Sequence, residues 1–427
     1  MISYPQVLVI SNNSFSKSNS NGRTLGGLFT GWPQDKLAQF CISTDFPDYN
    51  VCNNYYCVSD FAALKAAISL KPAVRNDLKS RELISSSLIP ANRIKRTSIK
   101  SIIRHVVWTI GAWKGKSFYR WIDNINPQIV VIQSGDTAFT HNIAIDIAKR
   151  YNAKLVFFNT EGIYFLRKNF LYKGFLDAIF FPIYKKIYNH AYERAMKYAS
   201  YAVYLNDSLK VDNDALFHVP SIVIHNSSSL SPSNLSFNSE SPKFTYLGNF
   251  GFDRFKALAD VADVLQELND SYYLDVYGKA SSNIENFFKT TKGIRFHGYV
   301  SYEKVVDIIM HSDILIHAES QNEKFQESLK YGFSTKIADC LSCGRSFVLY
   351  AAPELACSIY LRKTGAGWYV GSRNELRTTI RTILDNEKVR NENIKKSLQV
   401  AANNHSIKKN SARFQKLLLS ITTECEK

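Results

Sequence analysis

The segment FSTKIADCLSCGR, residues 333–345, contains a lysine and an aspartate whose spacing suits anion chemistry. Lys336 and Asp339 are three residues apart, so a helix would present both on one face, about one turn from each other. Ser334 or Thr335 can cap the first turn of that helix, and a helix N-terminus attracts anions. The segment is therefore a candidate site for an anionic ligand.

A second candidate is the segment GNFGFDRFK, residues 248–256, which follows a predicted strand and opens a predicted helix. Its glycines allow close approach of the backbone, and Arg254 and Lys256 supply positive charge. This combination suits a diphosphate. The alternative, an ordinary turn with solvated basic side chains, stays open for this loop taken alone.

The elements that position these residues follow from the alternation of short apolar runs with helical patterns, which is typical of parallel α/β domains. Strands are predicted at 6–11, 39–43, 128–133, 154–159, 201–206, 243–249, 272–278, 293–298, 313–318 and 346–351. Helices are predicted at 138–150, 254–268, 281–290, 302–310 and 335–343, with a final helical segment at about 373–420. A polar stretch rich in Ser and Asn, 225–243, separates the two halves.

This pattern predicts an α/β protein with two doubly wound, Rossmann-like domains. We expect an N-terminal domain at 1–225, a linker at 226–242, a second domain at 243–400, and a helix at 401–427 that packs back on the first domain. Ligands of open parallel sheets bind outside the carboxyl ends of the strands, and two facing sheets enclose a cleft. The chemistry should therefore lie on the strand-to-helix loops.

Composition bounds the class of protein. The chain has 427 residues, 45% of them hydrophobic, and no apolar run approaches the ~18–20 residues that span a bilayer. We find no basic leader with a cleavage site at the N-terminus and expect a cytoplasmic protein. Its seven cysteines are scattered and are expected to be free thiols. Cys340 and Cys343 lack a second ligand pair nearby, so no metal site is expected.

The net charge of +16 is concentrated. Residues 75–120 contain eleven basic and two acidic side chains, and within them apolar residues recur at helical spacing from Ile99 to Trp113 while Lys100 and Arg104 lie largely off that face. One interpretation is a basic amphipathic helix that docks on an anionic membrane, with Trp108 and Trp113 inserting. The other is a core-facing helix with a solvated basic back. The aromatic and basic stretch 165–199 favours a membrane, and no nucleic-acid-binding module is present.

The order of motifs in the second half resembles the nucleotide-sugar-binding domain of retaining GT-B glycosyltransferases, particularly family 4-like enzymes of bacterial surface polysaccharides. The motifs are YLGNFGFDRFKAL, LDVYG, IRFHGYVSYEKV, DILIHAES, STKIADCLSCGRSFVL and GAGWYV. The first half adds NGRTLGGLF (21–29), with Gly22, Arg23 and Gly26 in an expected glycine loop, and VFFNTEGIYF (156–165). The resemblance implies two Rossmann-like domains that face each other across a cleft.

The resemblance also implies a donor site. Asp339 stands where the family's glutamate holds the ribose hydroxyls. The cations at the diphosphate would make a metal unnecessary, and backbone and rings in the third motif would frame the base. The implied donor-binding residues are Arg254, Lys256, Lys336, Asp339, Thr335, Gly278, His297, Tyr299 and Val300. The family's earlier glutamate is replaced by Tyr331, and either Glu319 or the loop 331–335 could substitute for it.

For catalysis, Glu161 stands near the position where relatives carry a histidine, directly after a strand. Asp136 and His141 follow the preceding strand and are alternatives, and helix capping or a surface polar role competes with each. The D-N-D at 212–214 resembles a metal-binding motif of the other glycosyltransferase fold but lies in an expected polar loop. No cofactor is expected beyond the donor.

These features predict transfer of a sugar from a nucleotide-diphosphate sugar to a glycan or lipid-linked acceptor, with retention, in capsule, O-antigen or exopolysaccharide synthesis. The expected location is peripheral, on the inner face of the plasma membrane. Two alternatives remain open: a non-hydrolysing nucleotide-sugar epimerase and a non-catalytic scaffold of the same fold.

Overall fold

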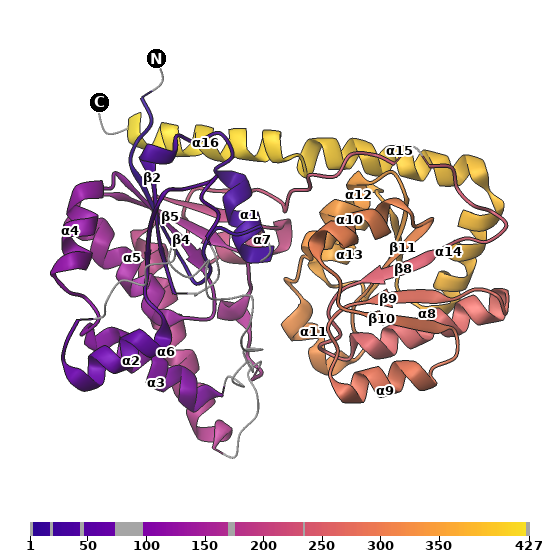
Figure 1. The fold of residues 1–427 in the computed structure, drawn as a ribbon, viewed down its shortest axis with the longest axis horizontal. Coiled ribbons are helices and arrows are strands. Elements are labelled where there is room, and N and C mark those ends of the chain that lie inside the picture. The colour runs from indigo at the N-terminus through magenta and orange to yellow at the C-terminus, as the bar shows by residue number, and fades with distance from the viewer. Residues whose placement is uncertain are drawn as a thin grey trace. The chain divides into compact units, whose positions relative to one another are not determined.

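The computed structural model describes residues 3–17, 20–42, 47–72, 97–169, 176–233 and 235–423. They form two compact units (Figure 1). The N-terminal unit comprises the chain up to Leu205, Leu209–Ile224 and the segment from Ser411 onward. The C-terminal unit comprises Asn206–Ser208 and His225–Asn410. Each unit is an α/β domain built on its own parallel sheet.

The sheet of the N-terminal unit has seven strands among the described residues, in the order β3-β2-β1-β4-β5-β6-β7. They are β1 (Val7–Ser11), β2 (Leu37–Cys41), β3 (Asn54–Cys57), β4 (Ile129–Ser134), β5 (Lys154–Asn159), β6 (Tyr201–Tyr204) and β7 (Ser221–Val223). β1 pairs with β2 on one side and β4 on the other, so the strand order reverses between β1 and β4. That reversal is the topological switch point where such sheets bind ligands.

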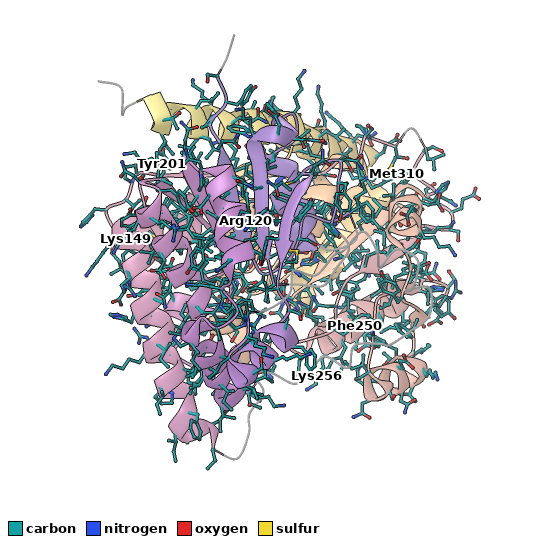
Figure 2. All side chains as sticks on the ribbon, turned by 60° about the vertical axis from the view of Figure 1, so that its left-hand side comes forward. Arg120, Lys149, Tyr201, Phe250, Lys256 and Met310 are labelled. Carbon is teal, nitrogen blue, oxygen red and sulfur yellow. A yellow bond between two sulfur atoms is a disulfide. The ribbon has the colours of Figure 1, made fainter. Side chains whose placement is uncertain are left out.

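Within the described ranges, helices and two short 3-10 turns connect these strands. They are α1 (Ser20–Leu28), η1 (Gln34–Lys36), α2 (Asp60–Ser69), α3 (Ser98–Ile110), α4 (Lys116–Ile125), α5 (Ala138–Arg150), η3 (Ile163–Phe165), α6 (Asp177–Tyr198) and α7 (Asp207–Asp214). Ser59 caps α2 and Thr97 caps α3, because each side-chain oxygen accepts a hydrogen bond from a backbone N–H of the first turn. Charged side chains such as Lys149 on α5 point outward (Figure 2).

The sheet of the C-terminal unit has six strands within the described ranges, in the order β10-β9-β8-β11-β12-β13. They are β8 (Phe244–Leu247), β9 (Leu274–Tyr277), β10 (Ile294–Gly298), β11 (Ile314–Ala318), β12 (Ser346–Tyr350) and β13 (Trp368–Val370). The switch point lies between β8 and β11, which pair directly. Both units therefore share one Rossmann-like strand order.

The helices of the second half follow the predicted alternation. They are α8 (Arg254–Leu268), α9 (Ser282–Thr290), α10 (Tyr302–Met310), α11 (Glu323–Leu329), α12 (Thr335–Ser342), α13 (Ala356–Thr364), α14 (Arg373–Asp385), α15 (Glu387–Asn404) and α16 (Ile407–Thr423). In the described part of the chain, none of the helices is long and apolar enough to cross a bilayer.

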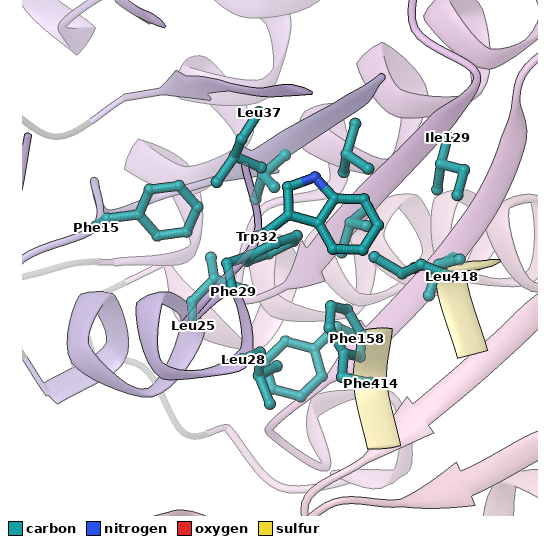
Figure 3. Close-up of a cluster of buried hydrophobic side chains, with 14 of the residues drawn as sticks. Phe15, Leu25, Leu28, Phe29, Trp32, Leu37, Ile129, Phe158, Phe414 and Leu418 are labelled. Carbon is teal, nitrogen blue, oxygen red and sulfur yellow. The ribbon is translucent and has the colours of Figure 1, made fainter. Parts of the chain in front are cut away.

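The last helix completes the core of the N-terminal unit. Phe414 and Leu418 of α16 pack with Trp32, Phe29 and other apolar side chains of that core (Figure 3). The rings of Phe29 and Phe414 meet edge to face, with centroids 5.4 Å apart. Because α16 is the most distant part of the sequence from α1, this core depends on a long-range contact.

The Ser- and Asn-rich stretch 225–243 is tied to the C-terminal unit by hydrogen bonds. The guanidinium of Arg345 donates to the carbonyl of Leu235 at 2.9 Å and to the hydroxyl of Ser233 at 2.8 Å. The buried amide of Asn410 donates to the carbonyl of His225 at 3.0 Å. Leu230 and Phe237 also pack against the cores of this unit, so both polar and apolar contacts hold the stretch in place.

The expectation of free thiols is wrong for two of the cysteines. Cys41 and Cys57 end the neighbouring strands β2 and β3, lie directly opposite each other, and form a disulfide. Their Cα atoms are 4.7 Å apart, within disulfide range, and strand register rather than sequence spacing creates this proximity. Cys52, Cys340, Cys343 and Cys357 are buried free thiols. Cys425 lies outside the described residues.

The expectation that Trp108 and Trp113 insert into a membrane is also wrong. Both side chains are buried, at 2% and 0% exposure. Trp108 stacks on Phe139 of α5 with 4.8 Å between ring centroids, and its indole N–H donates to Asp60. The tryptophans face the core, so α3 turns its isoleucine stripe away from it. The more N-terminal basic residues, Arg75 to Arg96, lie outside the described residues.

Candidate functional site

The carboxyl edge of the second sheet brings three loop starts close together. Gly278 follows β9, and its N–H donates to the carbonyl of Gly298 at the end of β10, at 2.8 Å. A side chain at Gly278 would begin 2.1 Å from the carbonyl oxygen of Gly248, which follows β8. Only glycine permits this approach, so the backbones of the three loops lie close together.

The predicted base-binding side chains lie at the same edge of the sheet. His297 stacks on Tyr277, with ring centroids 4.5 Å apart, and its Nε2 lies 2.6 Å from Oδ1 of Asp275. Tyr299 is mostly exposed and Val300 is half-buried. An exposed aromatic ring next to backbone amides is suited to stacking on a planar base.

The switch point of the second sheet contains a buried ion pair. The Nε of Arg254, the first residue of α8, donates to Oε2 of Glu319 at 2.6 Å, and the two side chains are only 12% and 7% exposed. A second arginine nitrogen, Nη1, donates to Oδ1 of Asn249 at 2.6 Å. Glu319 directly follows β11, so residues after β8 and β11 meet as the topology predicts.

Glu319 stays ionised although it is enclosed. Burial alone would raise its pKa, but the hydrogen bond from His317 and the charge of Arg254 lower the pKa below its usual value. Nε2 of His317 lies 3.1 Å from Oε1 of Glu319. His317 and Lys336 border one small internal void, which places Lys336 next to this cluster.

The loop from β8 to α8 has an unusual backbone. Phe252 and Asp253 are consecutive non-glycine residues with φ of 58° and 60°. Each costs roughly 1–2 kcal/mol, and such strain gathers at ligand-binding loops. Lys256 is exposed on the first turn of α8 and pairs with Asp253 at 3.0 Å.

The segment from 333 to 345 forms the expected capped helix. Ser334 caps α12 by accepting a hydrogen bond from the N–H of Lys336, and Thr335 is the first residue of the helix. Asp339 is buried, and its Oδ1 accepts a hydrogen bond from the hydroxyl of Ser228 at 2.6 Å. Ser228 belongs to the predicted linker, and nothing in its sequence context indicated this contact.

Tyr331 occupies the position of the missing glutamate. Its side chain is buried, its hydroxyl accepts a hydrogen bond from Lys330 at 3.0 Å, and its carbonyl accepts one from Asn206 at 3.0 Å. A buried phenol cannot take over the contacts of a carboxylate. Of the two predicted substitutes, Glu319 is the one that carries a carboxylate into the cluster.

The candidate catalytic residues lie at the switch point of the first sheet. Asp136 comes two residues after β4 and is partly exposed, and its Oδ1 accepts a hydrogen bond from the amide of Asn12 at 3.4 Å. Asn12 directly follows β1 and also accepts from the hydroxyl of Thr137 at 3.2 Å. Reasoning from sequence missed Asn12, although its place after the first strand was a usable signal.

Glu161 is exposed two residues after β5 and near the same edge. The hydroxyl of Tyr188 donates to the carbonyl of Gly135 at 3.0 Å. Burial raises the pKa of Tyr188, and the charges of Glu161 and Asp136 raise it further, which shows that both carboxylates are near this phenol. Two acids and a neutral tyrosine thus gather at the carboxyl ends of β4 and β5.

Two other sequence expectations fail in this unit. His141 is wholly enclosed, its Nε2 lies 3.0 Å from the hydroxyl of Ser134, and burial lowers its pKa to about 3. The expected glycine loop is the helix α1, which contains Gly22, Arg23 and Gly26. A Cβ at Gly22 would lie 2.3 Å from the carbonyl oxygen of Ser14, so Gly22 serves helix packing rather than a flexible loop.

The D-N-D motif is part of α7 instead of a polar loop. Asp214 pairs with Lys210 and accepts from the hydroxyl of Ser221, while Asn213 is buried and accepts from Tyr192. Within the described ranges, no group of three or more His, Cys, Asp or Glu side chains could hold a metal ion.

Comparison with known proteins places the fold. No family model matches the sequence, and no curated protein matches it significantly. The solved structure of HepE (Alr3699) from Anabaena in complex with UDP matches with a TM-score of 0.59 and 10% identity, over 97% of this chain and 100% of that one. TarM matches with a TM-score of 0.60 and 9% identity, over 97% and 99% of the two chains. A glycosyltransferase from Rickettsia africae matches with a TM-score of 0.59 and 14% identity, over 98% and 99%.

The chain has the GT-B fold. The likeness covers both sheets and their helices, and the Rossmann-like strand order of each unit agrees with it. At this level of identity the comparison establishes architecture, and the assignment of function rests on the residues at the two switch points.

Proposed function

We propose that this protein is a glycosyltransferase that moves a sugar from a nucleotide-diphosphate sugar to a glycan or lipid-linked acceptor. The observation that supports it is the pair of segments at the carboxyl edge of the second sheet, where Arg254 begins α8 beside Glu319 and α12 carries both Lys336 and the carboxylate of Asp339. Cations suit a diphosphate, and a carboxylate can accept two hydrogen bonds from a ribose diol. HepE was crystallised with UDP-glucose, so uridine nucleotides are the first donors to test.

The proposed reaction retains the configuration of the anomeric carbon. The bond between that carbon and the diphosphate breaks through an oxocarbenium-like state. Arg254 and Lys336 would offset the charge that grows on the leaving diphosphate, so the chemistry needs no metal. The departing phosphate would accept the proton of the acceptor hydroxyl, and Glu161 or Asp136 would stabilise the positive charge.

The proposal includes synthesis of capsule, O-antigen or exopolysaccharide on the inner face of the plasma membrane. The Cys41–Cys57 disulfide is the observation that opposes a cytoplasmic location, because structural disulfides are rare in reducing compartments. Fractionation of the host cell, with thiol labelling of the purified protein, tests this part separately.

Calorimetry with a panel of nucleoside diphosphates tests the donor site. We expect one base to bind preferentially, and the matching nucleotide sugar to yield a glycosylated acceptor. Binding of none would indicate a scaffold, and epimerised nucleotide sugar formed without acceptor would indicate an epimerase. A product of inverted configuration would exclude retention.

Variants test the acceptor side. Asp136→Asn and Glu161→Gln should lower kcat without changing the dissociation constant of the nucleotide, because neither residue lies in the donor unit. Asp146→Asn, an exposed carboxylate on α5, is the matched control. Unchanged kcat in both variants would remove these carboxylates from the mechanism.

A further inference from the structure

Three helices of the N-terminal unit turn large apolar side chains to the solvent. α2 packs on α3 and α3 packs on α6, and Figure 1 shows the three together at the lower end of this unit. More than half of the exposed large hydrophobic side chains in the described ranges belong to or flank them. Representative members are Phe61, Ile68, Ile103, Val106, Ile179 and Ile183. We call this surface the α2-α3-α6 face.

The α2-α3-α6 face is distinct from the surfaces that the same helices bury in the core. Ala63 and Ala66 of α2 and Trp108 of α3 already face the interior, whereas Ile103 and Val106 form an outward stripe on α3. Exposed apolar patches of this extent on a folded protein mark sites of interaction with a partner or a membrane.

Basic side chains predominate around the face. Lys65, Lys71, Lys100 and Lys186 are exposed on or beside the three helices. The acidic residues that open α2 and α6 are engaged within the unit: Asp60 accepts from Arg104 at 2.8 Å, and Asp177 accepts from the N–H of Ser98 at 3.4 Å. α3 contains no acidic residue. An anionic surface is therefore the complement of this face.

We propose that the α2-α3-α6 face docks the N-terminal unit on an anionic lipid bilayer. The lysines would lie among the headgroups and the apolar side chains at the boundary with the acyl chains. In this proposal the exposed apolar side chains of the face, and not the buried Trp108 and Trp113, insert into the bilayer.

The face also adjoins the candidate acceptor site. In α6, the exposed Ile183 is followed by Tyr184, whose hydroxyl donates to the carbonyl of Asp136 at 2.8 Å. A docked protein would hold the side chain of Asp136 close to the membrane surface. We therefore infer that the acceptor is a lipid-linked sugar. This second step rests on the proposed function, whereas the docking does not.

Flotation of the full-length protein with vesicles tests the docking. We expect binding to phosphatidylcholine vesicles that contain phosphatidylglycerol, little binding to pure phosphatidylcholine, and loss of binding as salt increases. A wild-type protein that ignores the anionic vesicles at low salt would overturn the proposal.

Matched variants assign the binding to this face. Ile103→Ser with Ile179→Ser should weaken partitioning at least about tenfold, whereas Val211→Ser with Leu216→Ser, elsewhere in the same unit, should not. The first pair is 54% and 61% exposed and the control pair 64% and 54%, so loss of stability should be equally small in both. Equal partitioning of the two double variants would overturn the proposal.

Replacement of lysines by glutamine tests the electrostatic part of the docking independently. Lys65→Gln, Lys100→Gln and Lys186→Gln together should weaken partitioning about a hundredfold at low salt, while the same change at Lys116, Lys149 and Lys416, which are exposed on other helices, should have a far smaller effect. Equal effects would show general attraction and exclude a defined face.

Two further outcomes separate the alternatives. A concentration-dependent dimer in analytical ultracentrifugation that Ile103→Ser with Ile179→Ser abolishes, without vesicle binding, would make the face an interface between copies. Vesicle binding by a protein that binds no nucleoside diphosphate would leave the docking intact and refute glycosyl transfer. The reverse result would refute the docking alone.

Discussion

Glu319 controls how much positive charge the second switch point offers to an anion. The sequence suggested three cations for a diphosphate, but Arg254 is paired with Glu319 and Lys256 with Asp253. A diphosphate that binds Arg254 therefore competes with a carboxylate already in place.

Replacement of Glu319 should change how the stability of the protein depends on pH. Glu319→Gln should lower the free energy of unfolding at neutral pH by about 3 kcal/mol, because Arg254 loses its counter-charge while remaining buried. Because the folded-state pKa of Glu319 is lowered, its stabilisation is present above the unfolded-state pKa of about 4.3 and is lost as the pH falls through the folded-state pKa. Urea denaturation at neutral and acid pH measures this, with the exposed Glu323→Gln as control. A difference between wild type and Glu319→Gln that does not shrink in acid would contradict the assignment.

In the proposed function, Asp339 holds the ribose hydroxyls of the donor. Asp339→Ala should weaken binding of the preferred nucleoside diphosphate by about 1.5–3 kcal/mol, the range for hydrogen bonds to a charged group. Ser228→Ala removes only the hydrogen bond to Oδ1 and leaves the carboxylate, so its effect should be smaller. Calorimetry on both variants checks this. An unchanged dissociation constant in Asp339→Ala would remove the residue from the site.

At the scale of the elements, buried strands and amphipathic helices could be predicted, whereas of the described edge strands only β10 was. The helices predicted at 138–150 and 254–268 coincide with α5 and α8. β3, β7 and β13 escaped notice because each is a short edge strand, and NYYC, SIV and WYV lack the extended apolar run of a central strand.

The sequence also could not predict which side of a helix faces the core. The spacing of isoleucines identified a stripe on α3, but only the packing of Trp108 against Phe139 shows that this stripe is exposed. Contacts between residues that are distant in the sequence could not be predicted either. Arg254 and Glu319, and likewise Ser228 and Asp339, meet only because the sheet and its connections bring them together.

The glycines of α1 offer a test of packing against helix propensity. Gly22→Ala should destabilise the protein by about 1–3 kcal/mol, since its Cβ would lie 2.3 Å from a backbone oxygen that cannot easily move. Gly27→Ala, in the same helix, meets nothing within 4 Å and should stabilise it by up to about 1 kcal/mol. Thermal unfolding compares the two. Destabilisation of similar size in both would mean that α1 is not packed as described.

At the scale of the whole molecule, the N-terminal unit is assembled from distant parts of the sequence. Phe414→Ala should lower the free energy of unfolding of this unit by about 3–5 kcal/mol, as for other large-to-small changes in a core. Four of the five tryptophans lie in this unit, so their fluorescence during denaturation reports on it. Lys416→Ala, an exposed change in the same helix, is the control. Nucleotide binding by the C-terminal unit should persist in Phe414→Ala, and its loss would show that the two units do not fold independently.

The place of α16 in the first core also determines the order of events on the ribosome. Residues up to 224 are synthesised well before Phe414 and Leu418, so the nascent N-terminal unit exposes the apolar surface around Phe29 and Trp32 during translation of nearly two hundred further residues. The C-terminal unit, encoded in between, has its whole sheet available earlier than its predecessor has its last helix. The half of the protein that is made first is therefore completed last, and the nascent chain needs protection by chaperones for that interval.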